Sequence, residues 1–338
     1  MKLHFDSNQE YQIEAIRAVT DLFEGQPLSG GDFEFSLTST GALLSENGVG
    51  NRLALTEEQI WENIKSIQQR HEIKTENKDL QGMHFSVEME TGTGKTYVYL
   101  RSIYELNKLY GFKKFVIVVP SVAIREGVLK NLQITHEHFQ NLYDKAQISY
   151  EVYDSKKVSS LRGFACNNAI HILVINIDSF AKDENVINKP NDKLIGKRPI
   201  EFIQGANPIV IVDEPQNMET EVRKKAIANL NPLCTLRYSA THTNLYNLVY
   251  SLNPVKAYDL GLVKQIEVDS VISENAMNEA FIQLEGIRAT KTKITAKIKI
   301  DCNTDKGVMK KSISVKAGDD IYKLSKQREI YKEGFIID

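Results

Sequence analysis

The chain has 338 residues, of which 42% are hydrophobic and 25% are charged. These are ordinary globular values, and a prior of about 150 residues per domain predicts roughly two compact units. The formal net charge is -2, so the chain as a whole is not a basic binder of nucleic acid or membranes. No apolar run approaches the roughly 18 residues of a membrane span, and the three cysteines form no zinc or disulfide pattern. We therefore expect a cytoplasmic protein with no membrane partner.

Near the N-terminus, "NQEYQIEAI" places Tyr11 and Gln12 next to each other. The Gln12 amide can both donate to and accept from one edge of adenine, and the Tyr11 ring offers a surface for a base. A surface glutamine at the start of a helix is the commoner explanation. Residues 25–56, rich in Gly, Ser and Thr, predict a hairpin or loop insertion, and residues 57–69 predict a helix.

A Gly-rich turn follows within residues 87–100, "VEMETGTGKTYVYL". Gly92 and Gly94 let backbone amides approach phosphate oxygens, Lys95 can reach the outer phosphates, and the Thr96 hydroxyl can ligate magnesium. The strict phosphate-loop pattern has another glycine five positions before Gly94, where this chain has methionine. An ordinary strand-to-helix turn is therefore the alternative interpretation.

Four short runs rich in apolar residues predict strands at residues 83–89, 115–119, 172–177 and 209–212. The last three are nearly unbroken apolar runs, as expected for strands buried on both faces of a parallel sheet. Helices are predicted over residues 96–110 and 122–132, and the polar segment 182–199 predicts a surface loop. Strands that alternate with helices indicate an α/β fold, whose ligands lie at the carboxyl ends of the strands.

Two later strand ends carry further candidates. In "IVIVDEPQ", Asp213 ends an apolar strand, where it can hold magnesium through water, and Glu214 can orient or deprotonate an attacking water. A solvated acidic strand end is the alternative, but the phosphate loop upstream favours a nucleotide site. In "LRYSATHTN", Ser239, Ala240 and Thr241 close another strand. Their hydroxyls could bond to the acidic loop and relay the nucleotide state, although a plain Ser/Thr turn has the same sequence pattern.

Toward the C-terminus the sequence changes to short alternating strands. In "KITAKIKI", one face of the predicted strand carries the apolar residues Ile294, Ala296, Ile298 and Ile300. The other face carries lysines. Residues 301–307 predict a turn and residues 310–316 a partner strand. The sequence thus predicts two units, residues 1–265 with the insertion already described, and a smaller β-rich segment over residues 266–338.

The order of these motifs carries a resemblance to a known family. Gln12, "TGTGKT", "VPSVAIREGV", "INIDSF", "DEPQ" and "SAT" resemble the first RecA-like lobe of superfamily 2 helicases. Within that superfamily, "METGTGKT", "DEPQ" and the segment that begins "LRYSATHTNLYNLVYSLNPV" resemble the Res subunit of type III restriction enzymes. The resemblance covers about residues 5–265 and continues more loosely to the end. It implies a RecA-like phosphate-loop lobe with a mostly parallel sheet, and a β-rich segment that leads into a second lobe.

The resemblance also implies functions for particular residues. The ATP-binding residues would be Gln12, Thr91, Gly92, Thr93, Gly94, Lys95 and Thr96. Thr96 and Asp213 would hold Mg²⁺. The catalytic residues would be Lys95, Asp213 and Glu214. Coupling of the site to movement would depend on Ser239, Ala240 and Thr241. Pro120, Ser121, Asn176, Ser179 and Phe180 would lie along the nucleic-acid backbone, with simple strand-to-helix turns as the alternative.

As a whole, the resemblance implies an ATP-driven motor that acts on double-stranded DNA together with the Mod methyltransferase subunit. The nuclease of the family is absent from this chain, and so is the Q-x-x-G-R-x-x-R pattern of the second lobe. We therefore expect the chain alone to be nearly inactive as an ATP hydrolase. Two alternatives stay open: another superfamily 2 DNA helicase or remodeller, and a non-catalytic nucleotide-binding module.

Overall fold

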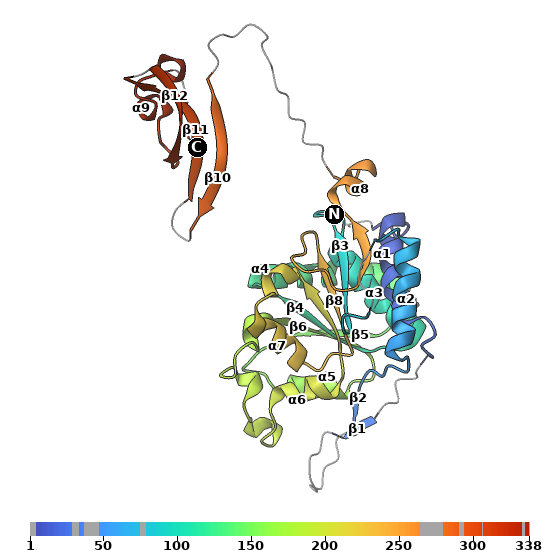
Figure 1. Ribbon diagram of the computed structural model, residues 1–338. Coiled ribbons are helices and arrows are strands. Elements are labelled where there is room, and N and C mark those ends of the chain that lie inside the picture. The colour runs from blue at the N-terminus through green and yellow to red at the C-terminus, as the bar shows by residue number, and fades with distance from the viewer. Residues whose placement is uncertain are drawn as a thin grey trace. The chain divides into compact units, whose positions relative to one another are not determined.

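The computed structural model describes residues 5–28, 34–36, 47–74, 79–263, 280–290, 294–305, 307–332 and 335–337. The chain divides into two compact units, Met1–Gln265 and Ile266–Asp338 (Figure 1). Across those ranges, no helix combines the length and the apolar character that a membrane crossing requires.

The first unit is built on a sheet of seven parallel strands in the order β5-β6-β4-β7-β8-β3-β9. The strands are β3 (His84–Met89), β4 (Lys114–Val119), β5 (Ile148–Val152), β6 (Ile170–Asn176), β7 (Ile209–Asp213), β8 (Cys234–Ser239) and β9 (Leu248–Leu252). Because the strands are parallel, their carboxyl ends share one edge of the sheet. The turn that follows β3 and the acidic pair that follows β7 are therefore brought to the same edge.

Helices cover both faces of this sheet (Figure 1). They are α1 (Glu10–Thr20), α2 (Glu57–Arg70), α3 (Lys95–Tyr110), α4 (Val122–Leu142), α5 (Ser160–Cys166), α6 (Pro199–Gly205), α7 (Glu221–Asn229) and α8 (Pro254–Asp259). One apolar core joins α1 to α4 to the sheet, and a second joins α5 to α7. In β4, Phe115, Ile117 and Val119 enter the first core and Val116 and Val118 the second, because successive side chains of a strand point to opposite faces. The predicted α/β, RecA-like fold is confirmed.

The helix predicted over residues 122–132 is longer than expected and ends at Leu142. Its second half, "QITHEHFQNL", is too polar to stand out in the sequence. Thr135 and Phe139 nevertheless follow Leu132 at spacings of three and four residues and are buried, so one stripe of α4 faces the core throughout.

The predicted insertion over residues 25–56 contains a short antiparallel pair, β1 (Glu34–Ser36) and β2 (Asn47–Val49). The rest of the predicted hairpin, residues 29–33 and 37–46, lies outside the described residues. Asn51 fastens the end of the segment to the start of β4. Its amide donates to the carbonyl of Lys114 at 2.7 Å and accepts from the amide of Lys113 at 2.8 Å.

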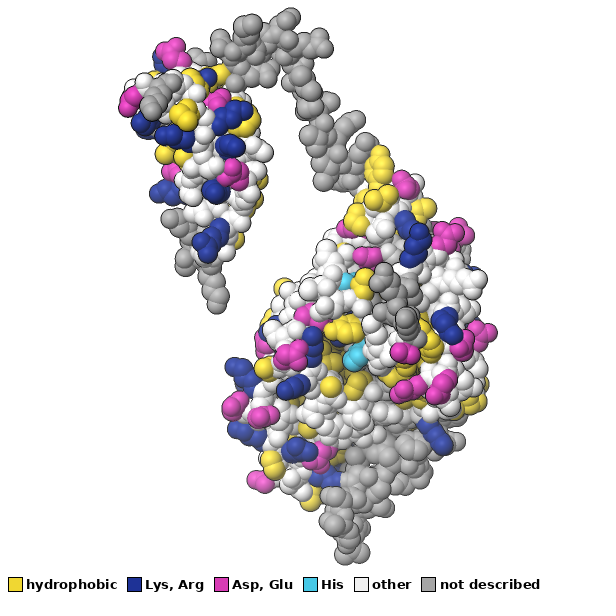
Figure 2. Space-filling view, viewed as in Figure 1, with side chains coloured by type: hydrophobic (Ala, Val, Ile, Leu, Met, Phe, Trp, Pro, Cys, Tyr) yellow, Lys and Arg dark blue, Asp and Glu magenta, His cyan; other side chains and the backbone are white. Residues whose placement is uncertain are grey.

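The polar segment 182–199 is a loop with two short 3₁₀ turns, η3 (Val186–Asn188) and η4 (Asp192–Leu194), before α6 begins at Pro199. Ile187 and Leu194 are buried in the second core and hold the loop against it. At the other end of the first unit, α8 carries exposed apolar side chains, which Figure 2 shows as a yellow group.

The second unit is an antiparallel sheet in the order β10-β11-β12 with a short helix. Its elements are β10 (Ile282–Ala289), β11 (Ile294–Thr304), β12 (Gly307–Val315) and α9 (Ile321–Leu324). The turn predicted over residues 301–307 is too long, because β11 continues to Thr304 and β12 begins at Gly307. Cys302 explains the difference: it is buried beside Ile298 and Ile300 and extends their inward alternation.

Candidate nucleotide-binding site

The turn between β3 and α3 is the predicted phosphate loop, and two of its glycines have unusual backbone angles. Gly92 and Gly94 have positive φ angles of 83° and 90°, which side chains rarely permit. A Cβ atom on Gly94 would lie 2.5 Å from Nε2 of Gln12, so the Gln12 side chain would have to shift. The helix that follows begins at Lys95, and its N-terminal amides and dipole favour an anion at this point.

Gln12 and Tyr11 hold the phosphate loop from the side of α1. Gln12 Nε2 and the Tyr11 hydroxyl each donate to the carbonyl of Thr93 at 3.1 Å. The Tyr250 hydroxyl on β9 in turn donates to the carbonyl of Tyr11 at 2.8 Å. The amide nitrogen of Gln12 is therefore engaged with the loop, and its role as a reader of adenine stays a prediction.

The two threonines of the loop differ in their surroundings. Thr91 is exposed, and its backbone amide donates to the Glu90 carboxylate at 2.8 Å. Thr93 is buried, and its hydroxyl donates to the Glu90 carbonyl at 2.7 Å. The hydroxyl of Thr93 thus stabilises the turn itself, whereas Thr91 stays accessible.

The structure brings Lys95 and Glu214 together, although 119 residues separate them in the sequence. The Lys95 ammonium donates to Oε1 of Glu214, and both side chains are partly buried. Glu214 has left-handed backbone angles, φ 57° and ψ 58°, a conformation that costs a residue with a side chain about 1 to 3 kcal/mol. Its amide donates to the carbonyl of Tyr238 at 3.0 Å, which fixes this bend after β7.

Asp213 ends β7 and is 4% exposed. Burial raises the pKa of its carboxyl group to about 6, with Lys95 acting to lower that pKa and Glu214 to raise it. Oδ2 accepts a hydrogen bond of 3.2 Å from the Tyr99 hydroxyl, whereas Oδ1 is buried with no partner among the described residues. Mg²⁺ prefers oxygen ligands, and the unpaired carboxylate oxygen of Asp213 and the Thr96 hydroxyl are both of this kind. These residues therefore fit a magnesium ion.

A chain of polar contacts leads from Glu214 to the end of β8. Gln216 donates to Oε2 of Glu214 at 2.7 Å, and the Ser239 hydroxyl donates to the Gln216 side chain at 2.8 Å. The backbone amide of Thr241 donates to the Ser239 hydroxyl at 3.0 Å. Ala240 lies between these two residues and contributes no side-chain polar group. The expected link between the two loops therefore runs mainly through Gln216, a residue that the sequence did not single out.

A pocket of about 660 Å³ opens beside these residues. Its lining includes Phe5, Gln12, Glu90, Lys95, Thr96, Tyr97 and Glu214. The lining thus draws on the N-terminal segment, the turn after β3 with α3, and the acidic end of β7, together with Asn131 of α4 and Leu262 after α8. The volume lies within the range of about 300 to 1,000 Å³ that is typical of small-molecule and cofactor sites.

The residues predicted to lie along nucleic acid fall into two groups. Pro120 and Ser121 follow β4, and Asn176 ends β6, next to them because Val119 pairs with Asn176 in the sheet. The Ser121 hydroxyl accepts from the backbone amide of Ile124 and caps α4. These three residues therefore share the edge of the sheet that carries the phosphate loop.

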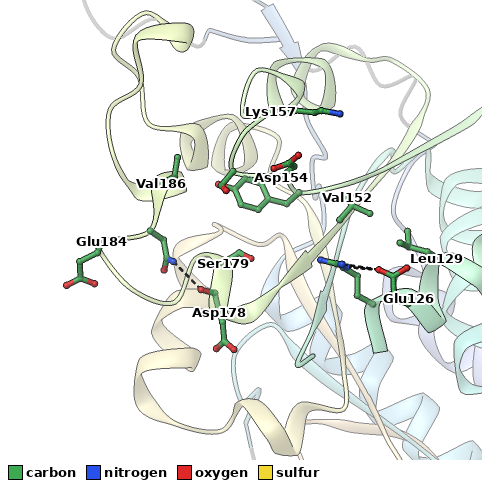
Figure 3. A pocket seen from close by; sticks show the side chains of 13 residues that line it. Glu126, Leu129, Val152, Asp154, Lys157, Asp178, Ser179, Glu184 and Val186 are labelled. Carbon is green, nitrogen blue, oxygen red and sulfur yellow. Dashed lines mark hydrogen bonds and ion pairs between the residues drawn. The ribbon is translucent and has the colours of Figure 1, made fainter. Parts of the chain in front are cut away.

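Phe180 is placed less favourably for a phosphate contact than Ser179. Phe180 is 2% exposed and packs in the second core, so its side chain is withdrawn from the surface. Ser179 lines a second pocket, of about 830 Å³, together with Glu126, Asp154, Asp178 and Glu184 (Figure 3). Arg125 and Lys157 line the same pocket, and Arg125 pairs with Glu126. Charges of both signs therefore surround Ser179, and its contact with a phosphate stays a prediction.

A buried ion pair joins β8 to the segment that follows β7. Arg237 on β8 is 3% exposed and donates to Glu219, which follows the acidic end of β7. The Glu219 carboxylate also accepts from Asn244 at 2.9 Å, and the Arg237 guanidinium lies 4.8 Å from the centre of the Tyr246 ring. Burial raises the pKa of Glu219, but hydrogen bonds to Asn244 and Arg237 lower it more, so the carboxyl group stays ionised below its usual pKa.

Replacing Glu219 with glutamine is expected to lower the free energy of unfolding of the first unit by about 3 kcal/mol, because the Arg237 charge is then buried without a counter-charge. Urea unfolding followed by the fluorescence of Trp61, the one tryptophan of the chain, measures this loss. The stabilisation by Glu219 should be fully present at pH values above the pKa that glutamate has in the unfolded chain. It should disappear as the pH falls through the lower pKa that Glu219 has in the folded protein. Glu221→Gln, which removes an exposed carboxylate two residues away, is the control and should change stability by less than about 0.5 kcal/mol. Equal effects of the two variants would contradict the assignment of Arg237 and Glu219 as a stabilising pair.

Comparison with known proteins places these features in a family. A family described as "Type III restriction enzyme, res subunit" matches residues 7–244. The Res subunit of the type III enzyme EcoPI, from Escherichia phage P1, is 31% identical over 285 residues, which are 78% of this chain and 28% of that protein. The Res subunit of EcoP15I, from Escherichia coli, is 32% identical over 237 residues, 63% of this chain and 24% of that protein.

A solved structure of a nuclease-deletion mutant of the type ISP restriction-modification enzyme LlaGI with a DNA substrate mimic is also similar. It has a TM-score of 0.37 and 15% identity, and the match covers 53% of this chain and 16% of that chain. The present chain spans less than a third of the length of the two Res subunits just described. Because the family match covers the predicted phosphate loop, both acidic residues and the end of β8, the chain belongs to the family of type III restriction enzyme Res subunits.

Proposed function

We propose that this chain is the ATP-binding lobe of a DNA motor and that it hydrolyses ATP at the pocket beside the phosphate loop. The observation that carries the proposal is the convergence of Lys95 and Glu214, from distant parts of the sequence, with Thr96 at the same pocket. A phosphate loop, a metal-holding carboxylate and a carboxylate that handles water are the parts that phosphoryl transfer requires.

In this proposal the residues divide the chemistry between them. The amides of the loop and the N-terminus of α3 bind the phosphates, and Lys95 leaves Glu214 to contact the outer phosphates. Thr96 and Asp213 would hold Mg²⁺, which neutralises charge on the phosphates. Glu214, released from the ion pair, orients the attacking water and accepts its proton.

We further propose that the lobe acts on double-stranded DNA with a Mod methyltransferase partner, as expected for a member of this family. Pro120, Ser121 and Asn176 are the candidates for the DNA backbone, since they share the edge of the sheet with the nucleotide pocket. On the face of the first unit seen in Figure 2, basic and acidic side chains are interspersed. Contacts through hydroxyls and backbone amides suit such a surface and do not depend on DNA sequence.

Replacing Lys95 with alanine tests the proposed site. In a longer form of the protein that carries a second lobe, we expect ATP hydrolysis to fall by about 10²- to 10³-fold, because the transition state loses a preorganised positive charge. Hydrolysis is best followed under single-turnover conditions with protein in excess over ATP, so that a slow reaction is still measured. Lys108→Ala removes an exposed lysine from the same helix, α3, and should leave the rate unchanged. A Lys95→Ala variant that hydrolyses ATP as fast as the wild type would remove the phosphate-loop assignment.

A further inference from the structure

Tyr99 is a buried residue that joins the two proposed magnesium-binding elements. It lies on α3, three residues after Thr96, and its side chain is fully buried. Residues three apart on a helix lie on the same side of it, so Tyr99 follows Thr96 toward the sheet. There its ring meets the edge of the Tyr238 ring on β8, at 5.5 Å between centroids and an angle of 61°.

The Tyr99 hydroxyl makes the two oxygens of Asp213 different. It donates to Oδ2 at 3.2 Å, and Oδ1 is buried and has no hydrogen-bond partner within the described part of the chain. A buried carboxylate oxygen without a partner is costly, because the water that it loses on burial is not replaced by a protein hydrogen bond. The carboxylate is therefore held by one oxygen while the other remains as an acceptor.

We propose that Tyr99 is a positioning residue that fixes the Asp213 carboxylate through Oδ2, so that Oδ1 is the oxygen that faces the hydrated magnesium ion of bound Mg–ATP. This inference rests on the proposed function, because it assumes that ATP and magnesium bind at this site. Groups that hydrogen-bond to metal-binding side chains fix their orientation, and their loss typically lowers metal affinity by about 10- to 100-fold.

The chemistry of the phenol suits this purpose. A phenol hydroxyl is protonated at neutral pH, and the geometry directs this proton to Oδ2 of Asp213. The hydroxyl therefore keeps its proton and acts on Asp213 only as a donor. The same bond ties α3, which carries Lys95 and Thr96, to the end of β7.

The test compares Tyr99→Phe with Tyr238→Phe. Tyr99→Phe removes the hydroxyl that bonds to Asp213 and keeps the ring. Tyr238→Phe removes the hydroxyl of the other ring in the same pair, and that hydroxyl makes no bond to Asp213. For each protein, ATP binding is measured by calorimetry over a range of Mg²⁺ concentrations and again with EDTA. Tyr99→Phe is expected to raise the half-saturating Mg²⁺ concentration by about 10- to 100-fold and to leave metal-free ATP binding unchanged. Tyr238→Phe should change neither quantity.

A double-mutant cycle then shows whether Tyr99 acts through Asp213. In an Asp213→Asn background, adding Tyr99→Phe should cause no further shift in the Mg²⁺ requirement, because the carboxylate that it positions is gone. An equal shift in both backgrounds, an unshifted Tyr99→Phe variant, or a variant that also loses metal-free binding would overturn the assignment of Tyr99 while the proposed function stands. Wild-type protein that binds no ATP at any Mg²⁺ concentration would overturn the proposed function, and the role of Tyr99 with it.

Discussion

Residues 1–338 are expected to hydrolyse bound ATP about 10³- to 10⁵-fold more slowly than a longer form of the protein that carries a second lobe. In related phosphoryl-transfer sites an arginine that faces the phosphates stabilises the charge of the transition state, and its contribution has this size. The sequence of this chain has no Q-x-x-G-R-x-x-R pattern that would supply such an arginine. ATP binding should nevertheless be retained, because Lys95, Thr96 and the loop amides all belong to the first unit.

The measurement compares single-turnover phosphate release by residues 1–338 and by the longer protein, each with Mg²⁺, DNA and Mod. ATP binding to both is followed in parallel, so that slow chemistry is separated from weak binding. If residues 1–338 hydrolysed ATP rapidly and DNA stimulated that hydrolysis, no second lobe would be required. This result would also contradict our interpretation of the chain as one half of a motor site.

Replacing Glu214 with glutamine is expected to lower ATP hydrolysis by about 10² to 10⁴-fold while ATP binding is kept. The amide preserves the shape of the side chain but cannot accept a proton from water. Binding should not weaken, because the carboxylate that competes with phosphate for the Lys95 ammonium is removed. Binding by calorimetry and hydrolysis under single-turnover conditions are both measured, with Glu221→Gln as the control for loss of a nearby exposed carboxylate.

Two other outcomes of the Glu214→Gln experiment carry different meanings. A collapse of ATP affinity would make Glu214 a structural residue that holds Lys95 and the bend after β7. If the variant bound ATP and hydrolysed it at the same rate as the wild type, a non-catalytic nucleotide-binding module would be favoured. That alternative gives Glu214 no part in the chemistry.

The sequence predicted the centre of the sheet better than its edges. β4, β6 and β7 are nearly continuous apolar runs because they are covered on both faces, and such runs are visible without a structure. β5 was not predicted, because it lies at the edge of the sheet and is only partly buried, so its sequence "ISYEV" mixes polar and apolar residues. The turn predicted over residues 301–307 was too long because Asp301 and Asn303 are polar residues on the outer face of a continuing strand.

The site was predicted as a set of residues but not as a set of contacts. The phosphate loop and Asp213 with Glu214 are recognisable because local sequence encodes a turn at a strand end. The bond from Tyr99 to Asp213 and the pair of Arg237 with Glu219 depend on the spatial order of β7, β8 and α3, which no local pattern fixes. Tyr99 could not be distinguished from an ordinary core tyrosine, since only its partner sets it apart.

The most direct test of the central claim is a calorimetric titration of residues 1–338 with ATP in the presence of Mg²⁺, repeated with the Lys95→Ala variant. The account predicts one ATP bound per wild-type chain, with affinity that falls when Mg²⁺ is removed and falls strongly in the variant. Absence of binding to the wild type, or equal affinity of the two proteins for ATP, would contradict the assignment of this pocket as the nucleotide site.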